Sequence, residues 1–307
     1  GVRLKAYVGS GRTLDQKCGW KIDLNHYDLS GEYAGVETLT VNNMVQDQTY
    51  IHEHLAYMIY QEMGVPAPRT AYAQVYMNGT YYGLYLLVET VDENLLAGWF
   101  SDNTGTLYEG AYGVDLLPGY ENSFDYDEGP DPTDRSDLTR VIDIMQQPAT
   151  NENIALLEQY VNMDNILLNR AVESNILHWD GYTTANNYRI YHDPTTDQFF
   201  MIPWGTDQTF VDYWYGPWSG RGQLWVYCLQ NENCAARYDQ KLLDVAHTMM
   251  NMDLVGEAER IVNWLYAEFQ NDPRKEFSMS YWQYRYDATI TTLQTYPSSI
   301  EAQVLAH

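Results

Sequence analysis

The feature that most constrains the fold of this chain is a change in hydrophobic pattern near residue 138. Before it, apolar residues mostly alternate with polar ones, which predicts strands. The clearest alternating runs cover residues 20–24, 71–77 and 81–88. Asn78-Gly79, the dipeptide that best predicts a tight hairpin turn, separates the last two. The first part of the chain is therefore predicted to be mainly sheet.

One helix is expected among these strands. Residues 48–63 carry apolar side chains at helical spacing, and Gly64 and Pro66 then end the pattern. The order strand, helix, strand, hairpin describes a small β-rich unit with one helix.

The second part of the chain is predicted to be mainly helical, over residues 138–145, 151–177 and from 238 onward. A hairpin of residues 187–191 and 199–203 interrupts the helices. Residues 119–137 have the proline, glycine and acidic content of a loop, and we expect them to join the two parts. The fold class is therefore α+β.

The charge of the chain excludes several partners. It has 307 residues, with 42 Asp plus Glu against 17 Lys plus Arg, a net charge of −25 and a pI near 4.4. Such an acidic field repels nucleic acid and anionic membranes. With 45% hydrophobic and 14% aromatic residues the chain nevertheless has enough apolar side chains to form a core.

The composition favours an extracellular protein. Only 19% of residues are charged, and 28 Tyr contribute uncharged polar surface. No apolar run is long enough to span a membrane. The chain starts without Met inside an expected strand at residues 2–8, so we expect that an upstream region or leader has been removed.

The three cysteines support an oxidising compartment. Cys228 and Cys234 close a small polar loop that lacks the further Cys or His of a zinc site, so a disulfide is predicted, with two free thiols as the alternative. Cys18 is expected to be a small buried apolar residue.

Three polar residues suggest phosphoryl transfer. Asp180 lies at an expected helix end, Asn187 begins a strand, and Asp207 follows the hairpin. If they converge, one carboxylate deprotonates an acceptor hydroxyl while the other carboxylate and the amide oxygen hold magnesium against phosphates. The alternative is that the two aspartates only cap helices or turns.

Longer segments resemble the spore-coat protein H (CotH) kinase-like family. The strongest is Arg69-Thr-Ala-Tyr-Ala-Gln-Val-Tyr-Met-Asn-Gly-Thr-Tyr-Tyr-Gly-Leu-Tyr-Leu-Leu-Val-Glu-Thr-Val-Asp92. Gly105-Thr-Leu-Tyr108, the Pro-Trp-x-x-Asp segment at 203–207, and residues 48–66 and 180–191 also match. Matching stretches occur in order along nearly the whole chain.

The resemblance implies an atypical protein-kinase-like bilobal fold, with ATP and magnesium between a small β-rich lobe with one helix and a larger, mainly helical lobe. The expected division is a small lobe at 1–92, a hinge and acidic loop region at 93–137, and a large lobe with the catalytic hairpin at 138–307. The implied activity is transfer of the ATP γ-phosphoryl group to a Ser or Thr hydroxyl of a protein, with a Ser-rich surface protein as one candidate. The implied location is the cell surface or outside, after bacterial-type secretion.

The resemblance also assigns roles to residues. Asp180 corresponds to the catalytic base, and Asn187 and Asp207 correspond to magnesium ligands. Lys17 and Lys21 lie in the region expected to supply a phosphate-contacting lysine, although solvated lysines are the common alternative.

Three further residues complete this expected ATP site. Glu53, on the expected helix, would pair with one of the two lysines, unless it is only a solvent-facing helix residue. Glu89 and Val91 fall at the expected hinge, where backbone groups would bind adenine.

Three departures from the family pattern suggest an alternative function. Gly205 stands where many members have a metal-binding Asp, Glu109 where Lys is frequent, and His52 where Arg is frequent. Each removes a ligand or a positive charge, so the alternative is a catalytically weak surface-binding module. Transfer of a group other than phosphoryl also stays open. In an active enzyme, the acidic excess makes magnesium more necessary and favours a basic or neutral protein acceptor.

Other motifs have simpler explanations. His52 and His54 lack metal-binding spacing and are expected to lie on the surface. Four acidic residues of the 119–137 segment are candidates for a calcium site, against a solvated linker: Asp125, Asp127, Asp131 and Asp134. An aromatic group suggests either carbohydrate stacking or packing within the large lobe: Trp204, Trp214, Trp218, Trp225, Tyr213 and Tyr215.

Overall fold

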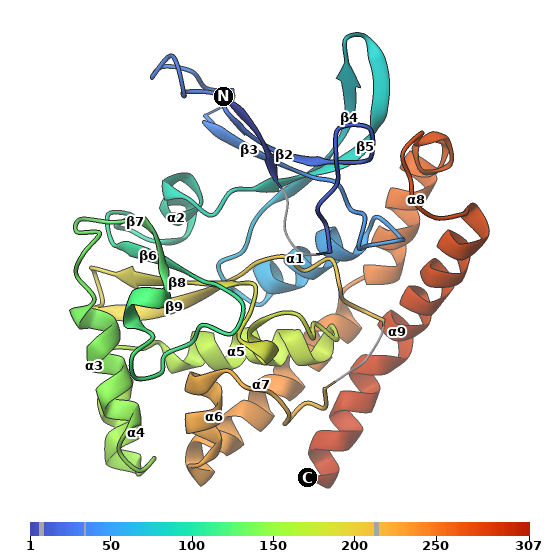
Figure 1. Ribbon diagram of the computed structural model, residues 1–307. Coiled ribbons are helices and arrows are strands. Elements are labelled where there is room, and N and C mark those ends of the chain that lie inside the picture. The colour runs from blue at the N-terminus through green and yellow to red at the C-terminus, as the bar shows by residue number, and fades with distance from the viewer. Residues whose placement is uncertain (6–8, 34, 212–214) are drawn as a thin grey trace.

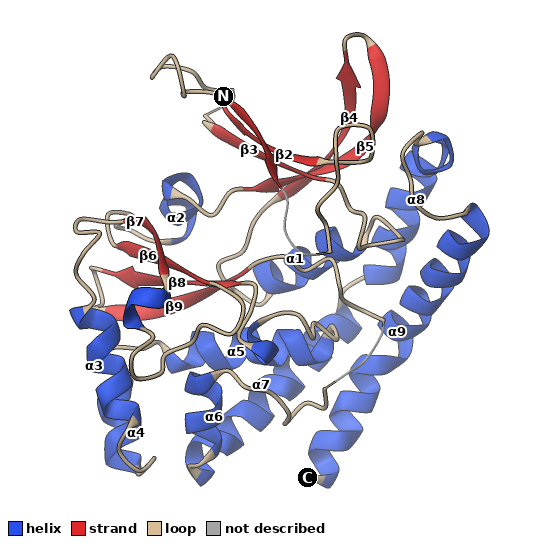
Figure 2. Cartoon of the chain, in the orientation of Figure 1, coloured by secondary structure: helices blue, strands red, loops and turns tan. Residues whose placement is uncertain are grey.

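The computed structural model describes residues 1–5, 9–33, 35–211 and 215–307. Figures 1 and 2 show a small sheet above a second sheet and a layer of helices. The small lobe is an antiparallel sheet with strand order β1-β2-β3-β5-β4. Its strands are β1 (Val2–Lys5), β2 (Gly19–Asp23), β3 (Thr38–Asn42), β4 (Thr70–Met77) and β5 (Thr80–Glu89). Of the strand expected at residues 2–8, the part at 6–8 lies outside the described residues.

The β4–β5 hairpin turns where the sequence predicts. Asn78 and Gly79 have φ angles of 50° and 79°, the positive values that a type I′ turn requires at both central positions. The Asn-Gly prediction is therefore confirmed.

Helix α1 (His52–Glu62) lies between the small sheet and the helices below it (Figure 1). It begins four residues later than the pattern suggests because Asp47 organises the preceding turn. The Asp47 carboxylate accepts hydrogen bonds from the His52 backbone N–H at 2.7 Å and the Thr49 hydroxyl at 2.6 Å. The helix ends before Gly64, whose φ is +75°. The start and the end of α1 together set which of its side chains face the large lobe.

A second antiparallel sheet, with order β7-β6-β8-β9, joins the middle of the chain to the predicted hairpin. Its strands are β6 (Thr106–Gly110), β7 (Asp125–Glu128), β8 (Tyr188–Asp193) and β9 (Gln198–Pro203). The hairpin prediction is confirmed. The expectation that 119–137 is all loop is wrong, because β7 pairs along β6 although strands are usually poor in acidic residues.

The large lobe is mainly helical, and α5 is its centre. Nearly every α5 side chain is buried, including the polar ones, because α6, α7 and β9 pack around it. The predicted helix at 151–177 is two helices, since the Asn162 side chain caps α5 by accepting from the Asn165 N–H at 3.0 Å. The helices are α2 (Glu93–Trp99), α3 (Ser136–Met145), α4 (Asn151–Leu157), α5 (Met163–Asn175), α6 (Gln223–Leu229), α7 (Glu232–Asn251), α8 (Leu254–Asn271) and α9 (Met279–Ala306).

This architecture confirms the α+β, two-lobed expectation. One continuous apolar core links the lobes, because it takes in Leu55 and Ile59 of α1 as well as Ile166 of α5. None of the helices in the described ranges is long and apolar enough to cross a membrane.

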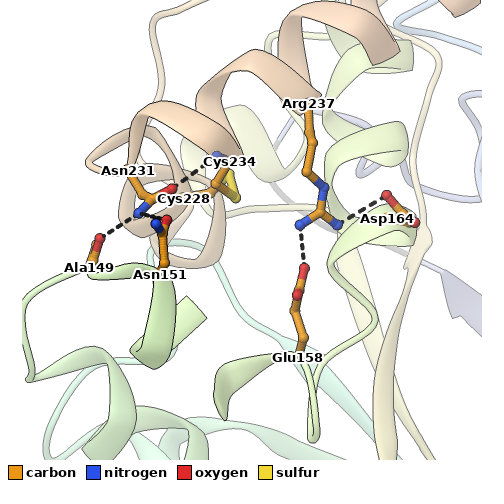
Figure 3. Close-up of a disulfide and its surroundings, with 8 residues drawn as sticks. All are labelled: Ala149, Asn151, Glu158, Asp164, Cys228, Asn231, Cys234 and Arg237. Atoms are coloured by element: carbon orange, nitrogen blue, oxygen red, sulfur yellow. Dashed lines mark hydrogen bonds and ion pairs between the residues drawn. A yellow bond between two sulfur atoms is a disulfide. The ribbon is translucent and has the colours of Figure 1, made fainter. Parts of the chain in front are cut away.

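The predicted disulfide is present between Cys228 and Cys234, with sulfur atoms 2.01 Å apart, and it joins the end of α6 to the first turn of α7 (Figure 3). Asn231 lies within the closed loop. Its amide donates to the Ala149 carbonyl oxygen at 3.0 Å and to the Asn151 side-chain oxygen at 2.9 Å, next to and within α4. The disulfide loop therefore also holds the start of α4.

Arg237 makes a second link between the same elements (Figure 3). Its guanidinium pairs with Glu158, just after α4, and with Asp164 of α5 at 3.2 Å. Cys18 is fully buried, as expected for a small core residue, with its sulfur 3.3 Å from the Tyr82 hydroxyl oxygen.

Candidate functional site

Asp180 lies in the segment that follows α5, where three side-chain amides surround its carboxylate. Asn186 and Asn187 each donate a hydrogen bond at 3.0 Å, and Gln208 donates one at 3.1 Å. Partial burial raises the pKa of Asp180, and these amides oppose that effect. The carboxylate is therefore held in one orientation by groups that favour its charged form.

Asn187 is positioned by an unusual backbone. Its φ is 47°, and its Nδ2 also donates to the Asp180 carbonyl oxygen at 2.8 Å. Because both contacts use the nitrogen end of a planar amide, the amide oxygen remains available as a ligand.

Gly205 permits the close approach behind Asn187. Its φ is +57°, and a Cβ at this position would lie 3.0 Å from the Asn187 Cγ. Any other residue here would strain the backbone and press on Asn187. The departure from the family pattern at this position therefore has a local structural reason.

Glu173 of α5 supports the segment that carries Asp180. Its buried carboxylate accepts from the backbone N–H groups of Tyr182 at 2.5 Å and Thr183 at 2.8 Å, and from the Thr183 hydroxyl at 2.8 Å. Burial raises the pKa of Glu173 to about 7. The buried His178 ring lies 4.0 Å away, and burial lowers its pKa to about 4. Glu173 thus anchors the segment that carries Asp180 to α5.

Asp207 is nine-tenths buried and faces residues of the small lobe. Burial raises its pKa well above the ordinary value, and the nearby Glu53 adds to this effect. The positive charge of Lys5 acts in the opposite direction. Asp180 also contributes to the field at Asp207, which places the two aspartates in one electrostatic neighbourhood.

Glu53 of α1 and Lys5 of β1 are the small-lobe partners. Burial raises the pKa of Glu53 to about 7, and Lys5 is the main group that opposes the rise. The Asn42 amide donates to the Glu53 carboxylate at 2.5 Å. Burial lowers the pKa of Lys5, while Glu53 and Asp207 favour its charged form. We call Lys5, Glu53, Asp180, Asn187 and Asp207 the inter-lobe cluster.

The predicted pairing of Glu53 with Lys17 is therefore corrected. Lys5 is the lysine whose charge acts most on Glu53, and Lys17 pairs with Asp272 instead, while the pairing of Glu53 with Lys21 stays a prediction. Glu53 is also buried, which excludes a solvent-facing role.

The donor chemistry of this region fits a hard divalent cation. Asp207 lies in the field of three other carboxylates, those of Glu53, Asp47 and Asp180, and the ammonium of Lys5 opposes them. No three His, Cys, Asp or Glu side chains form a ready metal-binding group in the described part of the chain. Magnesium typically takes only one or two protein carboxylates and fills its octahedron with water and phosphate oxygens. Asp207 and the Asn187 oxygen match that requirement.

Lys17 does not reach this region, so its expected contact with phosphate is wrong for this structure. Its ammonium is completely buried, where it donates to Asp272 at 2.6 Å and to the Tyr50 hydroxyl at 2.7 Å. Burial lowers its pKa to about 8. Asp272 lies just after α8 and also accepts from the Leu84 N–H of β5 at 3.2 Å. Lys17 therefore ties the small lobe to the C-terminal helices.

Lys21 lies on the same face of the small sheet as Lys5, because Arg3 is paired with Lys21 and Lys5 with Gly19. Its expected contact with phosphate stays a prediction. The charge of Lys21 acts on Asp92, the N-cap of α2, and on Glu109. The Glu89 N–H already donates to the Arg69 carbonyl oxygen at 2.8 Å, so it is not free to bind adenine. Val91 is buried in the apolar cluster beneath α2.

Glu109 and His52, the two other departures from the family pattern, each contact another residue in the structure. Glu109 accepts a hydrogen bond from Arg189 at 2.8 Å, directly across the β6–β8 pairing, so Arg189 supplies positive charge here. His52 is buried, not on the surface as predicted. Its ring contacts the Thr289 hydroxyl at 2.7 Å and the Asp207 carbonyl oxygen at 3.3 Å. His54 is partly buried and contacts Thr70 at 2.7 Å.

The acidic segment has local roles. Asp127 pairs with Arg189 at 2.9 Å, and Asp131 and Asp134 accept from N–H groups two residues ahead. The calcium hypothesis stays a prediction. Asp125 is exposed at the start of β7.

The aromatic residues are divided among different contacts. Trp225 is buried against Arg170, Trp218 stacks on His307, and Trp204 lies near both Lys5 and Arg189. Trp214 and Tyr213 lie outside the described residues, and Tyr215 lies near Arg170 and Glu173. Packing therefore accounts for Trp218 and Trp225.

Sequence reasoning missed Lys5, Gln208 and Glu173. Lys5 is in the expected first strand, but its place opposite Gly19 became known only from the pairing of β1 with β2. Gln208 directly follows Asp207. Glu173 carried no signal, because its function depends on a contact with residues nine and ten positions later.

A two-lobed α+β chain with carboxylate and amide groups gathered between its lobes has the architecture of a kinase-like protein. The chain belongs to the CotH family: the model described as CotH kinase protein matches residues 7–299. This confirms the resemblance seen in the sequence.

Two curated relatives support this assignment. Invasin CotH2 of Rhizopus delemar is 23% identical over 297 residues, which covers 86% of this chain and 50% of the relative. Inner spore coat protein H of Bacillus subtilis is 26% identical over 198 residues, which covers 58% of this chain and 51% of the relative. The chain thus spans about half the length of these relatives.

Among solved structures, the Helicobacter pylori proinflammatory kinase CtkA aligns over 99% of this chain and 96% of its own, with 9% identity and a TM-score of 0.43. HipA in a Shewanella oneidensis toxin–antitoxin complex aligns over 92% of this chain and 65% of its own, with 12% identity and a TM-score of 0.41.

Proposed function

We propose that this chain is an atypical kinase that transfers the γ-phosphoryl group of ATP to a Ser or Thr hydroxyl of a protein. The observation that carries the proposal is the inter-lobe cluster: Asn187 and Gln208, the residue after Asp207, both donate hydrogen bonds to Asp180, and the charges of Lys5 and Glu53 act on Asp207. Phosphoryl transfer needs such a set because its transition state is stabilised mainly by positioning and charge.

Each residue has a role in this proposal. Asp180 accepts the proton of the acceptor hydroxyl, and its three amide donors hold it in place. Asn187 and Asp207 would hold magnesium, which supplies positive charge to the phosphates. Lys5, whose charge acts on Glu53 and Asp207, takes the place of Lys17 as the proposed phosphate-contacting lysine.

We propose a location at the cell surface or outside the cell, with a Ser-rich surface protein as the candidate acceptor. The supporting observations are the Cys228–Cys234 disulfide and the printed names of the relatives, a spore coat protein and an invasin. The net charge of −25 favours a basic or neutral acceptor.

The test is phosphate transfer from labelled ATP with magnesium to this chain or to a synthetic Ser-rich peptide. Asp180→Asn should reduce transfer by roughly 10²- to 10⁴-fold, the usual contribution of a general base. Asp197→Asn, in the exposed turn between β8 and β9, is the matched control and should transfer normally. Transfer that persists in Asp180→Asn would remove Asp180 from the mechanism.

The second candidate is a surface-binding module without catalysis, favoured by the Gly205 backbone that leaves one acidic ligand out of the family pattern. Thermal unfolding with ATP and magnesium separates the two functions. A ligand that binds only the folded state raises its melting temperature. No shift at millimolar ATP would favour the binding module.

A further inference from the structure

Strand β4 has one open edge. It is the last strand in the order β1-β2-β3-β5-β4, so within the described residues β5 is its single neighbour in the sheet. The Glu89 N–H donates to the Arg69 carbonyl oxygen just before β4. Hydrogen-bonded pairs alternate in an antiparallel ladder, so Tyr72 and Gln74 direct their backbone N–H and C=O groups away from β5. These groups are a template for another strand.

A groove lies beside this edge, between β4 and α8. Its volume is about 180 Å³, on the order of ten times the space that one water molecule requires. In Figure 1 the β4–β5 hairpin stands next to the upper end of α8. The groove is lined by Tyr72, Ala73, Gln74, Leu84, Trp264, Leu265 and Glu268.

Trp264 gives the groove an aromatic wall that water reaches. Its side chain is 64% exposed, and its ring makes an edge contact with Tyr72 at 6.4 Å between centroids. Large aromatic side chains of this kind are typical anchors of binding sites.

Glu268 gives the groove a negative charge. It accepts a hydrogen bond from the neutral Tyr81 hydroxyl at 3.1 Å. Glu257, about three turns earlier on α8, is instead paired with Arg260 at 2.5 Å and with His54 at 3.2 Å. Glu257 is thus paired with cations, whereas Glu268 accepts from a neutral hydroxyl and is the carboxylate that lines the groove.

We propose that the β4–α8 groove binds an extended, basic peptide segment of a partner protein. The segment adds a strand to the open edge of β4 through the backbone groups of Tyr72 and Gln74. One of its Lys or Arg side chains enters the groove, against the Trp264 ring and the Glu268 carboxylate. Main-chain pairing supplies affinity in this mode, and the side-chain pocket supplies specificity.

The charges of the groove and of the whole chain favour a basic peptide over an uncharged one. An aromatic ring and a carboxylate together select a cation, and the net charge of −25 attracts basic segments over long range. The edge backbone groups require an extended main chain, which an oligosaccharide lacks. The site is separate from the inter-lobe cluster and does not depend on catalysis.

The experiment is calorimetric titration of the whole chain with a short acetylated peptide of alternating threonine and valine around a central arginine. Matched peptides carry citrulline or glutamate at the same position. The arginine peptide should bind at least about tenfold more tightly than the citrulline peptide, since a charged hydrogen bond is worth ~1.5–3 kcal/mol. The glutamate peptide should not bind.

Variants of the chain test each wall separately. Glu268→Gln and Trp264→Ala should each weaken binding of the arginine peptide by about tenfold or more. Gln74→Pro removes one outward N–H and should also weaken it, whereas Gln74→Ala should not. Tyr284→Ala, which changes a similarly exposed aromatic residue on α9, should bind normally. Circular dichroism confirms that each variant is folded.

Three results would overturn the proposal. Equal binding of the arginine and citrulline peptides would remove the basic specificity. Unchanged binding in Gln74→Pro would remove strand addition. Binding of a neutral oligosaccharide that is lost in Trp264→Ala, with no binding of the peptide, would make the groove a carbohydrate site.

Discussion

The side-chain nitrogen of Asn187 lies 2.8 Å from the carbonyl oxygen and 3.0 Å from a carboxylate oxygen of Asp180. One amide group thereby fixes both the backbone and the side chain of the proposed base. The same contact directs the amide oxygen of Asn187 away from Asp180, where it is free to act as a ligand. Two proposed functions, proton acceptance and metal binding, are therefore set by one geometry.

This relationship predicts different results for two neighbouring asparagines. Asn187→Ala removes both an amide donor to Asp180 and the proposed magnesium ligand, so phosphate transfer should fall by roughly 10²-fold or more. Asn186→Ala removes a similar donor, 3.0 Å from the Asp180 carboxylate and 3.2 Å from its carbonyl oxygen, but no proposed ligand, so phosphate transfer should fall much less. Single-turnover transfer from labelled ATP over a magnesium titration measures both. Equal losses in the two variants, with equal magnesium dependence, would exclude the ligand role of Asn187.

Lys5→Met is predicted to affect ATP binding, and Lys17→Met is predicted to affect stability. Lys5→Met should leave the fold intact but abolish the rise in melting temperature produced by ATP and magnesium. Lys17→Met leaves the buried Asp272 carboxylate without its cation, so it should lower the free energy of unfolding by about 3–5 kcal/mol. Denaturant unfolding and thermal shift on both variants provide the comparison. A stable Lys17→Met that no longer responds to ATP would reverse the two assignments.

Gly205→Ala is expected to harm both stability and transfer. The left-handed backbone costs about 1–2 kcal/mol for a residue with a Cβ, and that Cβ would press on Asn187 at 3.0 Å. Gly113→Ala is the matched control, because Gly113 has φ +77° and nothing within 4 Å of a Cβ. Thermal unfolding should show a loss in both variants, and transfer should fall only in Gly205→Ala. Normal transfer there would mean that Asn187 tolerates displacement.

The sequence was informative about the fold wherever local rules dominate. The Asn78-Gly79 turn and the β8–β9 hairpin depend on neighbours along the chain, and the structure matches both predictions closely. The strand β7 was missed because acidic residues rarely form strands, and only its pairing with β6 stabilises it. Tertiary contacts of this kind leave no periodic signal.

The candidate site was only partly readable for the same reason. Asp180, Asn187 and Asp207 were marked by their places after a helix, at a strand start and beyond a hairpin. A lysine, by contrast, has the same local pattern whether it is solvated, as was considered for Lys17, or buried against Asp272, 255 residues away. Lys5 and Lys17 could be told apart only by which carboxylates the fold brings to them.

Reduction of the disulfide should destabilise the large lobe. Closing the short loop between Cys228 and Cys234 is worth about 2 kcal/mol in the chain-entropy model. The double variant Cys228→Ala/Cys234→Ala should therefore unfold at lower denaturant concentration than the wild type, and a reductant should lower the midpoint of the wild type only. Urea unfolding with and without reductant measures this. The same midpoint in all four samples would show that the link adds nothing to stability.

Glu173 predicts a pH dependence of stability. Burial raises its pKa from 4.5 to about 7, so between these values the folded chain holds a proton that the unfolded chain has released. The free energy of unfolding should therefore fall as the pH rises from about 4.5 to about 7, by at most about 3 kcal/mol from this group, and then level off.

Glu173→Gln removes this titration while keeping the shape of the side chain. The difference in free energy of unfolding between wild type and variant, measured by urea unfolding at several pH values, isolates Glu173 from the other acids. Asp143→Asn, on the exposed side of α3, is the control and should give a flat difference. Wild-type stability that rises relative to Glu173→Gln over this range would mean that the backbone N–H groups of Tyr182 and Thr183 outweigh burial. Glu173 would then be ionised in the folded chain, holding the Asp180 segment as a charged acceptor.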